Sequence, residues 1–239
     1  MTAETDSVLW IFLHIPKTAG SSFRLALASE VKPEYNISID KTRGIQKRDD
    51  AFEEAIDEFL AKEKDRPFRF ASGHLKMAEA LRIRAAIQRP VKFITILRDP
   101  VDRVISEFRY QCTSTHPQHL EFLHSFPTLD SFVTHPRSQN KMRRHLAMPG
   151  ETVEATISRL EEDFSLVGVV EFYPQFVQRC SELVGEQLPH VRERVTQRTA
   201  DNDIDVTEAQ RMKIRQLNQL DQQLWQHFRD RIQYLSRWR

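Results

Sequence analysis

A short run of residues suited to phosphate binding spans residues 14–23 (HIPKTAGSSF). Gly20 lets main-chain N–H groups approach an anion, and Lys17 adds a positive point charge. A helix beginning here would add unpaired N–H donors and the positive end of its dipole. Further hydroxyl donors are Thr18, Ser21 and Ser22. The run therefore predicts a phosphate-binding loop; the alternative is an ordinary strand-to-helix turn with a solvated lysine.

The order of these residues differs from that of a Walker A loop. That loop reads G-x-x-x-x-G-K-[ST], whereas Lys17 precedes Gly20, the only glycine of the run. This difference argues against an ATP phosphotransferase with a P-loop-like site, which remains an alternative that a comparison of ATP plus magnesium with other donors would test.

A second anion-binding candidate is Arg98, in the segment LRDPVDRVIS. It follows an apolar run that predicts a strand, and ligands of open α/β sheets bind beyond the carboxyl ends of strands. A guanidinium there can hold a phosphate through two parallel hydrogen bonds. Ser106 lies about two helical turns further on, so it reaches the same phosphate only if that helix runs beside the ligand. In the alternative, Arg98 pairs with Asp99 or Asp102 and only closes the turn.

The candidate general base is His74, which follows Gly73 after a predicted strand. An imidazole has an ordinary pKa near neutrality, so it can accept a hydroxyl proton at working pH. A histidine satisfied within a loop is the alternative. His14 and then Glu171 are the next candidates. The other histidines show no compact metal spacing, so no zinc site is expected.

The elements that position these residues follow from apolar periodicity. Residues 8–14 predict a buried strand and residues 21–30 a helix, while residues 31–48 are polar and irregular. Further strands are expected at residues 69–71, 91–97 and 165–170. Further helices are expected from Asp49, from Pro100 to about Tyr110, and from Thr207. Loops and short helices are expected over residues 111–137.

The helix from Thr207 is predicted to be long. Thr207 and Gln210 form a capping box at its start. Its apolar stripe runs from Ile214 to Leu235 and is interpreted as core packing.

Length and composition limit the number of domains, the class of partner and the cellular compartment. The 239 residues are enough for one sizeable α/β domain, expected to span residues 1–239. A net charge of +1 argues against a nucleic-acid partner, so an anion must be held by local groups. The two cysteines, Cys112 and Cys180, indicate a reducing compartment. The apolar run at residues 8–13 is too short for a signal peptide or a membrane span, so a cytoplasmic protein is expected.

Together, the loop and the Arg98 segment resemble motifs of sulfotransferases that use 3′-phosphoadenosine 5′-phosphosulfate (PAPS). Residues 16–23 resemble the loop that binds the 5′-phosphosulfate, and residues 97–106 resemble the segment that binds the 3′-phosphate. The closest likeness is to the carbohydrate branch that includes heparan sulfate 2-O-sulfotransferase. Other pieces match this branch in order: Gly73-His74, Asn140 with Arg144, and residues 165–172 (SLVGVVEF).

This resemblance implies an α/β fold with a mostly parallel sheet flanked by helices, related to that of P-loop kinases. It implies transfer of a sulfuryl group from PAPS to an acceptor hydroxyl, favours a saccharide acceptor, and requires no metal. His74 would be the base, and Lys17 would assist the leaving group. The implied donor-binding residues are Lys17, Thr18, Ala19, Gly20, Ser21, Ser22, Phe23, Arg98 and Ser106. A non-catalytic nucleotide- or glycan-binding module on this scaffold is the remaining alternative.

The chain departs from the family pattern at a few positions. Ala19 stands where many members have a second small polar residue or glycine. Met142 and Arg143 replace the usual Gln and Thr after Asn140, and Met148 replaces a common glycine. These changes leave the donor site intact and bear on the acceptor site. The basic side chains at positions 141, 143 and 144 could meet an anionic acceptor, although a solvated helix face is the default interpretation.

Overall fold

A five-stranded parallel sheet forms the centre of the protein, with strand order β2-β3-β1-β4-β5. The structure is a computed structural model that describes residues 8–39, 48–114, 116–189, 199 and 202–236. The strands are β1 (Leu9–Leu13), β2 (Glu34–Ile37), β3 (Phe70–Gly73), β4 (Val91–Leu97) and β5 (Phe164–Val169). Every neighbouring pair is parallel, which confirms the predicted α/β class.

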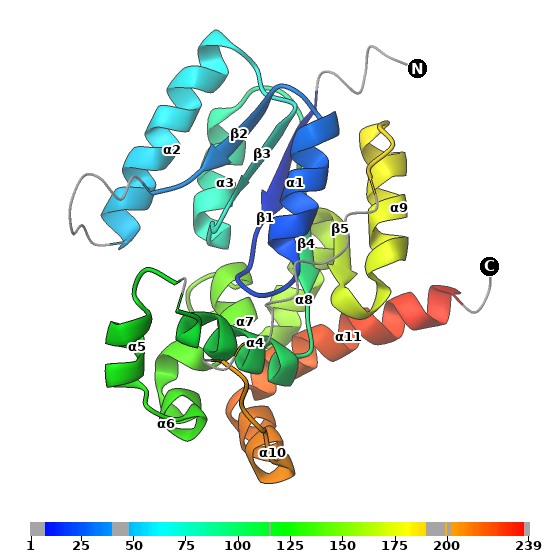
Figure 1. Ribbon diagram of the computed structural model, residues 1–239. Helices are drawn as coiled ribbons and strands as arrows, with labels where there is room; N and C mark the ends of the chain where they lie inside the picture. The colour runs from blue at the N-terminus through cyan, green and yellow to red at the C-terminus, as the bar shows by residue number, and fades with distance from the viewer. Residues whose placement is uncertain (1–7, 40–47, 115, 190–198, 200–201, 237–239) are drawn as a thin grey trace.

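Helices cover both faces of this sheet (Figure 1). One face carries α1 (Gly20–Glu30) and α9 (Tyr173–Val184). The other face carries α2 (Arg48–Asp65), α3 (Met77–Ala86), α8 (Val153–Asp163) and α11 (Gln219–Ser236). Successive β1 side chains enter the two apolar clusters in turn, because alternate residues of a strand point to opposite faces. A strand covered on both sides must be apolar throughout, as β1 is.

A further group of helices lies beyond the carboxyl ends of the strands (Figure 1). It comprises α4 (Pro100–Cys112), α5 (His119–Ser125), α6 (Leu129–Thr134), η3 (Pro136–Ser138), α7 (Lys141–Leu146) and α10 (Glu208–Leu217). Phe108, Phe122, Phe132 and Ile214 form the centre of its own apolar cluster. The short helices expected over residues 111–137 are therefore confirmed.

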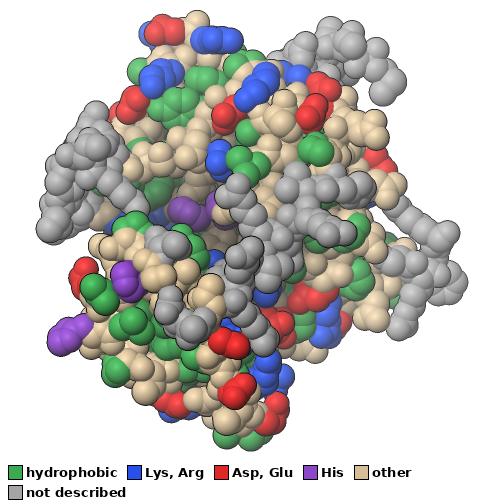
Figure 2. Space-filling view, in the orientation of Figure 1, with side chains coloured by type: hydrophobic (Ala, Val, Ile, Leu, Met, Phe, Trp, Pro, Cys, Tyr) green, Lys and Arg blue, Asp and Glu red, His purple; other side chains and the backbone are tan. Residues whose placement is uncertain are grey.

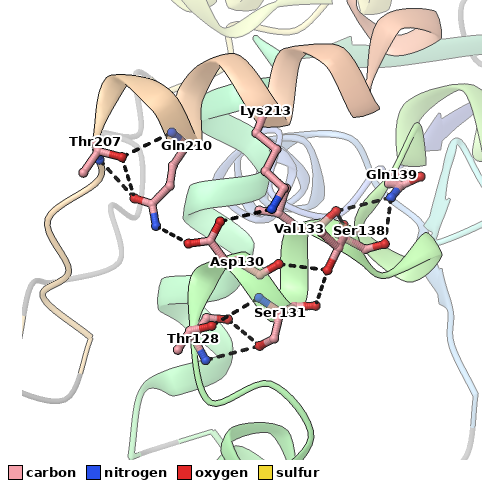
Figure 3. A network of polar contacts seen from close by, with 10 residues as sticks. Thr128, Asp130, Ser131, Val133, Ser138, Gln139, Thr207, Gln210 and Lys213 are labelled. Atoms are coloured by element: carbon pink, nitrogen blue, oxygen red, sulfur yellow. Dashed lines mark hydrogen bonds and ion pairs between the residues drawn. The ribbon is translucent and has the colours of Figure 1, made fainter.

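Polar contacts join α6 to α10 across this layer (Figure 3). The Asp130 carboxylate accepts a 2.7 Å hydrogen bond from the Gln210 amide. It also pairs with Lys213 at 3.3 Å. Thr207 and Gln210 form the predicted capping box at the start of α10. These contacts fix the C-terminal helices against the layer that follows β4.

The expectation of irregular structure over residues 31–48 is wrong for β2. Tyr35 and Ile37 of this strand are half-buried and buried, while Asn36 is exposed. β2 lies at the edge of the sheet and pairs only with β3. A short edge strand needs few apolar side chains and commonly carries polar ones, so its sequence signal is weak.

The long helix expected from Thr207 is broken at Asn218, between α10 and α11. The Asn218 backbone leaves the helical region, with φ of −121°. Its buried side chain accepts the Asn140 N–H at 2.8 Å and donates to the Ile214 carbonyl at 2.8 Å. The apolar stripe consequently divides between two clusters. Leu235 at its end is 54% exposed, which contradicts the core position expected for it.

The short helix η4 (Val170–Phe172), which leads into α9, completes the described elements. Within the described residues, no helix combines the length and apolarity that crossing a bilayer requires.

Candidate active site

The three chemically distinctive segments follow three adjacent strands. His74 comes directly after β3, residues 14–19 come after β1, and Arg98 comes after β4. β1 lies between β3 and β4, and all three run in parallel. Their carboxyl ends therefore meet at one edge of the sheet, where open α/β sheets bind ligands. The prediction that the ends of β3 and β4 face one crevice agrees with this strand order.

The loop between β1 and α1 holds two non-glycine residues in the left-handed region. The φ angle is 70° at Lys17 and 61° at Ala19. Such conformations each cost about 1 kcal/mol or more and concentrate at functional sites. Ala19 is also the N-cap of α1, and it offers no capping side chain. The first main-chain donors of this 11-residue helix are thus left without an N-cap side chain, as an anion site requires.

The hydroxyl-bearing residues of this loop differ in their exposure. Thr18 is completely buried, and its hydroxyl donates to the Ile15 carbonyl at 3.0 Å. Ser22 is also buried, whereas Ser21 is exposed at the start of α1. Phe23 packs edge-on against Phe12 at 4.9 Å between ring centroids, beneath the loop. The Thr18 hydrogen bond therefore shapes the loop from inside, and Ser21 is the hydroxyl open to solvent.

Gly20 is required by close packing at this point. A Cβ atom added there would lie 2.1 Å from the His14 ring. The His14 ring itself stacks on Phe12, with 5.5 Å between centroids, and is 9% exposed. The imidazole of His14 thus fills the space between β1 and the start of α1.

Lys17 points its ammonium group toward α4. The Nζ atom lies 3.8 Å from the centre of the Tyr110 ring, a cation–π contact. Burial lowers the pKa of Lys17 to about 8; the Glu107 carboxylate partly opposes this shift, and the Arg98 charge adds to it. An incoming phosphate would supply the missing counter-charge.

Arg98 donates from Nη1 to the Lys17 carbonyl at 3.2 Å. The alternative pairing with Asp99 or Asp102 is not observed. The Asp99 carboxylate instead caps α4 by accepting the Val101 N–H at 2.7 Å. Asp102 pairs with Arg211 at 3.4 Å.

Helix α4 runs beside the loop of residues 14–19. Lys17 contacts Arg98 just before this helix and Tyr110 in its last turn. Ser106 lies between these two positions on α4 and is half-buried. That Ser106 and Arg98 share one ligand stays a prediction.

His74 makes a short hydrogen bond that defines its tautomer. Its Nδ1 lies 2.6 Å from the His14 carbonyl oxygen. Because a carbonyl only accepts, Nδ1 carries the hydrogen and Nε2 keeps its lone pair. Burial lowers the pKa of His74, the His14 carbonyl partly opposes this, and the charges of Arg48 and Lys141 lower it further. His74 is therefore neutral at working pH, with a free proton-accepting nitrogen.

His74 is an exposed residue, although its ring lies close to that of His14, with 4.3 Å between the centroids. Figure 2 shows a hollow near the middle of one face, with histidine side chains at its wall.

The other base candidates are less available. His14 is buried, and burial followed by the nearby His74 lowers its pKa well below the usual value. Glu171 accepts hydrogen bonds from the Asp99 N–H and the Trp225 indole.

A buried ion network supports α4 from the other side. Arg103, which is 0% exposed, donates to Glu107 at 2.7 Å and to the Ser138 carbonyl at 2.8 Å. Lys141 also pairs with Glu107. The default interpretation of Lys141 as part of a solvated helix face is therefore wrong. The i, i+4 spacing of Arg103 and Glu107 was the available sequence signal for part of this network.

Asn140 has a structural role at the junction of α7 and α11. Its side-chain oxygen accepts the N–H groups of Leu220 and Asp221, both at 3.1 Å. In return, the Asp221 carboxylate accepts the N–H groups of Met142 and Arg143. Each helix start is thus capped by a residue from the other. Arg144 is exposed and donates to the Arg137 carbonyl at 2.6 Å.

Nowhere in the described residues do three or more His, Cys, Asp or Glu side chains come together in a group that could hold a metal ion. No curated protein matches the chain significantly. Among solved structures, mouse sulfotransferase SULT7A1 complexed with PAP matches with 16% identity and a TM-score of 0.42, over 90% of this chain and 65% of that one. A retinol dehydratase in complex with androsterone and inactive cofactor PAP matches with 12% identity and a TM-score of 0.34, over 92% and 65%.

The chain thus spans 65% of the length of each of these two proteins. The decisive comparison is with protein families. The profile described as "Sulfotransferase family" matches residues 1–178, which include the loop of residues 14–19, His74 and the Arg98 segment. The chain therefore belongs to the sulfotransferase family.

Proposed function

We propose that this protein transfers a sulfuryl group from PAPS to an acceptor hydroxyl. The observation that carries the proposal is the meeting of three segments at one sheet edge. The Lys17 carbonyl accepts from Arg98, and the His14 carbonyl accepts from His74. The loop of residues 14–19, whose groups can bind phosphate, is thereby hydrogen-bonded to the Arg98 guanidinium on one side and to the His74 imidazole, the candidate base, on the other.

The donor would be held by the loop and by α4. The main-chain donors at the start of α1 and the ammonium of Lys17 would bind the 5′-phosphosulfate. Arg98 and Ser106 would bind the 3′-phosphate and fix the orientation of the donor. Lys17 would also stabilise the charge that develops on the phosphate oxygen as its bond to sulfur breaks.

His74 would activate the acceptor. As the acceptor oxygen forms its bond to sulfur, its proton would pass to Nε2, and 3′-phosphoadenosine 5′-phosphate would leave. The His14 carbonyl acts as the orienting group, since it holds Nδ1 in the protonated form and keeps Nε2 free. This arrangement requires no metal ion.

The resemblance to heparan sulfate 2-O-sulfotransferase supports a saccharide acceptor.

We also propose that residues 1–239 form one catalytic domain. The apolar side of α11 packs with the sheet while Ile214 of α10 packs with the α4 layer, so the C-terminal helices join both layers. Both cysteines are free and buried, which supports a reducing, cytoplasmic environment.

Calorimetry with two nucleotides tests the donor assignment. 3′-Phosphoadenosine 5′-phosphate should bind and raise the melting temperature through mass action. Adenosine 5′-phosphate lacks the 3′-phosphate and should bind clearly more weakly, because Arg98 and Ser106 lose their partner. Equal affinities would exclude the roles given to these two residues.

A screen with radiolabelled PAPS tests the reaction itself. Label should pass to hydroxyl-bearing saccharides, and ATP with magnesium should transfer no phosphate to them. Binding of both donor and glycan without any transfer would identify the protein as a binding module on this scaffold.

A further inference from the structure

The turn that carries His74 is held by side chains from two other elements. The His74 carbonyl accepts a 2.7 Å hydrogen bond from Nη2 of Arg48, at the start of α2. The next carbonyl, that of Leu75, lies 3.1 Å from Nδ1 of His145 on α7. Main-chain carbonyls just after a strand are normally satisfied by water or by the chain's own turn. Here each is bound by a side chain far away in the sequence.

Arg48 is itself fixed in place. Its guanidinium contacts the Glu79 carboxylate at 2.8 Å and 3.4 Å, and it lies 4.2 Å from the centre of the Phe52 ring. The Glu79 carboxylate also accepts the Lys76 N–H at 2.6 Å, at the start of α3. A guanidinium held by a carboxylate and a ring keeps one orientation, because its donors form a rigid fork. The contact to the His74 carbonyl is therefore part of a fixed frame.

His145, on α7, is suited to hold the same turn through the Leu75 carbonyl. Because the Leu75 carbonyl only accepts, Nδ1 of His145 must carry a hydrogen. Burial lowers the pKa of His145 to about 3, with the nearby charges of Arg48 and Lys141 adding to the shift. The imidazole is thus a neutral donor throughout the working range, and its hydrogen bond does not change with pH.

We propose that Arg48 and His145 are positioning residues for the transfer reaction, which fix the main chain at and after His74 and so aim its Nε2 at the acceptor hydroxyl. This inference rests on the proposed role of His74 as the base. Neither residue is in the phosphate-binding loop or in the Arg98 segment, so both act on the acceptor half of the site. A misplacement of about 1 Å in such a frame can lower turnover by up to about 100-fold.

Arg48 also affects the pKa of His74 through its charge. The groups that face His74 are His14 from the β1 loop, Arg48 from α2, and Lys141 and His145 from α7. Both of these histidines have lowered pKa values and stay neutral. The positive charges of Arg48 and Lys141 disfavour a proton on His74. Removing the charge of Arg48 must therefore raise the pKa of His74.

The first experiment compares Arg48→Gln, Arg48→Lys and the control Arg82→Gln. Arg82 pairs with Asp57 at 2.6 Å, so it also links α3 to α2, but through exposed side chains away from the turn. In Arg48→Gln, NMR titration should show a raised pKa of His74, because one of the charges that lower it is gone. The acidic limb of kcat/KM should move by the same amount, and kcat should fall about tenfold while KM for PAPS stays constant.

The other two variants separate charge from position. Arg48→Lys keeps the positive charge but not the fork, so the pKa of His74 should stay near the wild-type value while kcat still falls. Arg82→Gln should match the wild type in both measurements. A melting curve for each variant identifies any loss of activity that is only a loss of folded protein.

The second experiment uses conservative rescue at His145. Asn places an amide N–H close to the position of Nδ1, so His145→Asn should retain most of the wild-type kcat. His145→Leu cannot donate to the Leu75 carbonyl, and its kcat should fall about tenfold. Equal activity of the Asn and Leu variants would overturn the role of His145.

The outcomes separate this inference from the function on which it rests. If His74→Ala is inactive while Arg48→Gln has wild-type kcat and an unshifted His74 pKa, the positioning role of Arg48 is overturned and the base stands. If His74→Ala retains wild-type turnover, the base assignment fails, and the catalytic role of Arg48 and His145 fails with it.

Discussion

Lys17 combines two properties that make donor binding depend on pH. Its ammonium lies against an aromatic ring rather than a carboxylate, and burial lowers its pKa to about 8. A bound phosphate would restore the preference for the charged form, so binding above pH 8 would take up a proton. Affinity for 3′-phosphoadenosine 5′-phosphate should therefore fall about tenfold between pH 7 and pH 9.

Calorimetry at both pH values, with Lys17→Arg as the control, measures this effect. Arginine stays charged over the whole range, so the variant reports only the titration of the ligand and of other groups. If wild type and Lys17→Arg change in parallel, the proton uptake does not come from Lys17.

His74 gives the second prediction for a single residue. His74→Ala should lower kcat by about 10²–10⁴-fold, because a positioned base contributes that much to proton removal. Affinity for 3′-phosphoadenosine 5′-phosphate should be unchanged, and the acidic limb of kcat/KM should be absent from the residual activity. His227→Ala is a suitable control, since His227 is exposed on α11 and pairs with Glu161 at 2.9 Å. Near-normal turnover of His74→Ala would direct the search to His14 and then to Glu171.

At the level of secondary-structure elements, the junction of β1 and α1 requires a residue without a side chain, Gly20. Gly20→Ala would place a Cβ atom 2.1 Å from the His14 ring, between a strand and a helix that are both packed in the core. The ring must then move, which disturbs the packing next to the carbonyl that holds His74. We expect urea denaturation to show a loss of about 1–3 kcal/mol, the usual cost of overpacking, together with reduced turnover.

Gly150→Ala is the matched control for this substitution. Gly150 has φ of +77°, but a Cβ atom there would meet nothing within 4 Å. Its cost should be only the backbone strain of about 1 kcal/mol, without any effect on turnover. If both variants lose the same stability and keep full activity, the contact between Gly20 and His14 does not support the site.

For the whole molecule, the ion network of Arg103, Glu107 and Lys141 joins α4 to α7. Burial opposes the ionised form of Glu107, but the charges of Arg103 and Lys141 prevail and lower its pKa below the usual value. Glu107→Gln would leave Arg103 buried without its partner, which typically costs about 3–5 kcal/mol. Exposed pairs contribute less than about 1 kcal/mol, so Glu182→Gln, which removes the exposed partner of Arg179, is the control.

The pH dependence of unfolding tests the same network. A lowered pKa means that Glu107 stabilises the fold above its unfolded pKa and that this contribution is lost as pH falls through its folded pKa. In urea denaturation, the difference between wild type and Glu107→Gln should thus be largest near neutral pH and shrink below about pH 4. A difference that is constant from pH 7 to pH 3 would mean that the charge of Glu107 is not what stabilises the helices.

Much of this architecture is determined by local sequence. β1 is an unbroken apolar run, and a short run of this kind is typical of a strand covered on both faces. Asp99 and Pro100 define the start of α4 through a side-chain cap and a fixed φ angle. The candidate residues Lys17, His74 and Arg98 could be identified for the same reason, because each follows an apolar run that ends abruptly.

Other features depend on partners that are distant in the sequence. Asn218 interrupts a helical pattern because Asn140, 78 residues away, requires its side chain. Lys141 is buried by Glu107, and the turn after β3 is held by Arg48 and His145. Local periodicity predicts which residues prefer a helix or a strand, but a hydrogen bond between distant side chains forms only once the sheet order has brought them together. The sequence therefore determined every strand except the edge strand β2, together with the chemistry at the strand ends, and the tertiary structure decided how that chemistry is held.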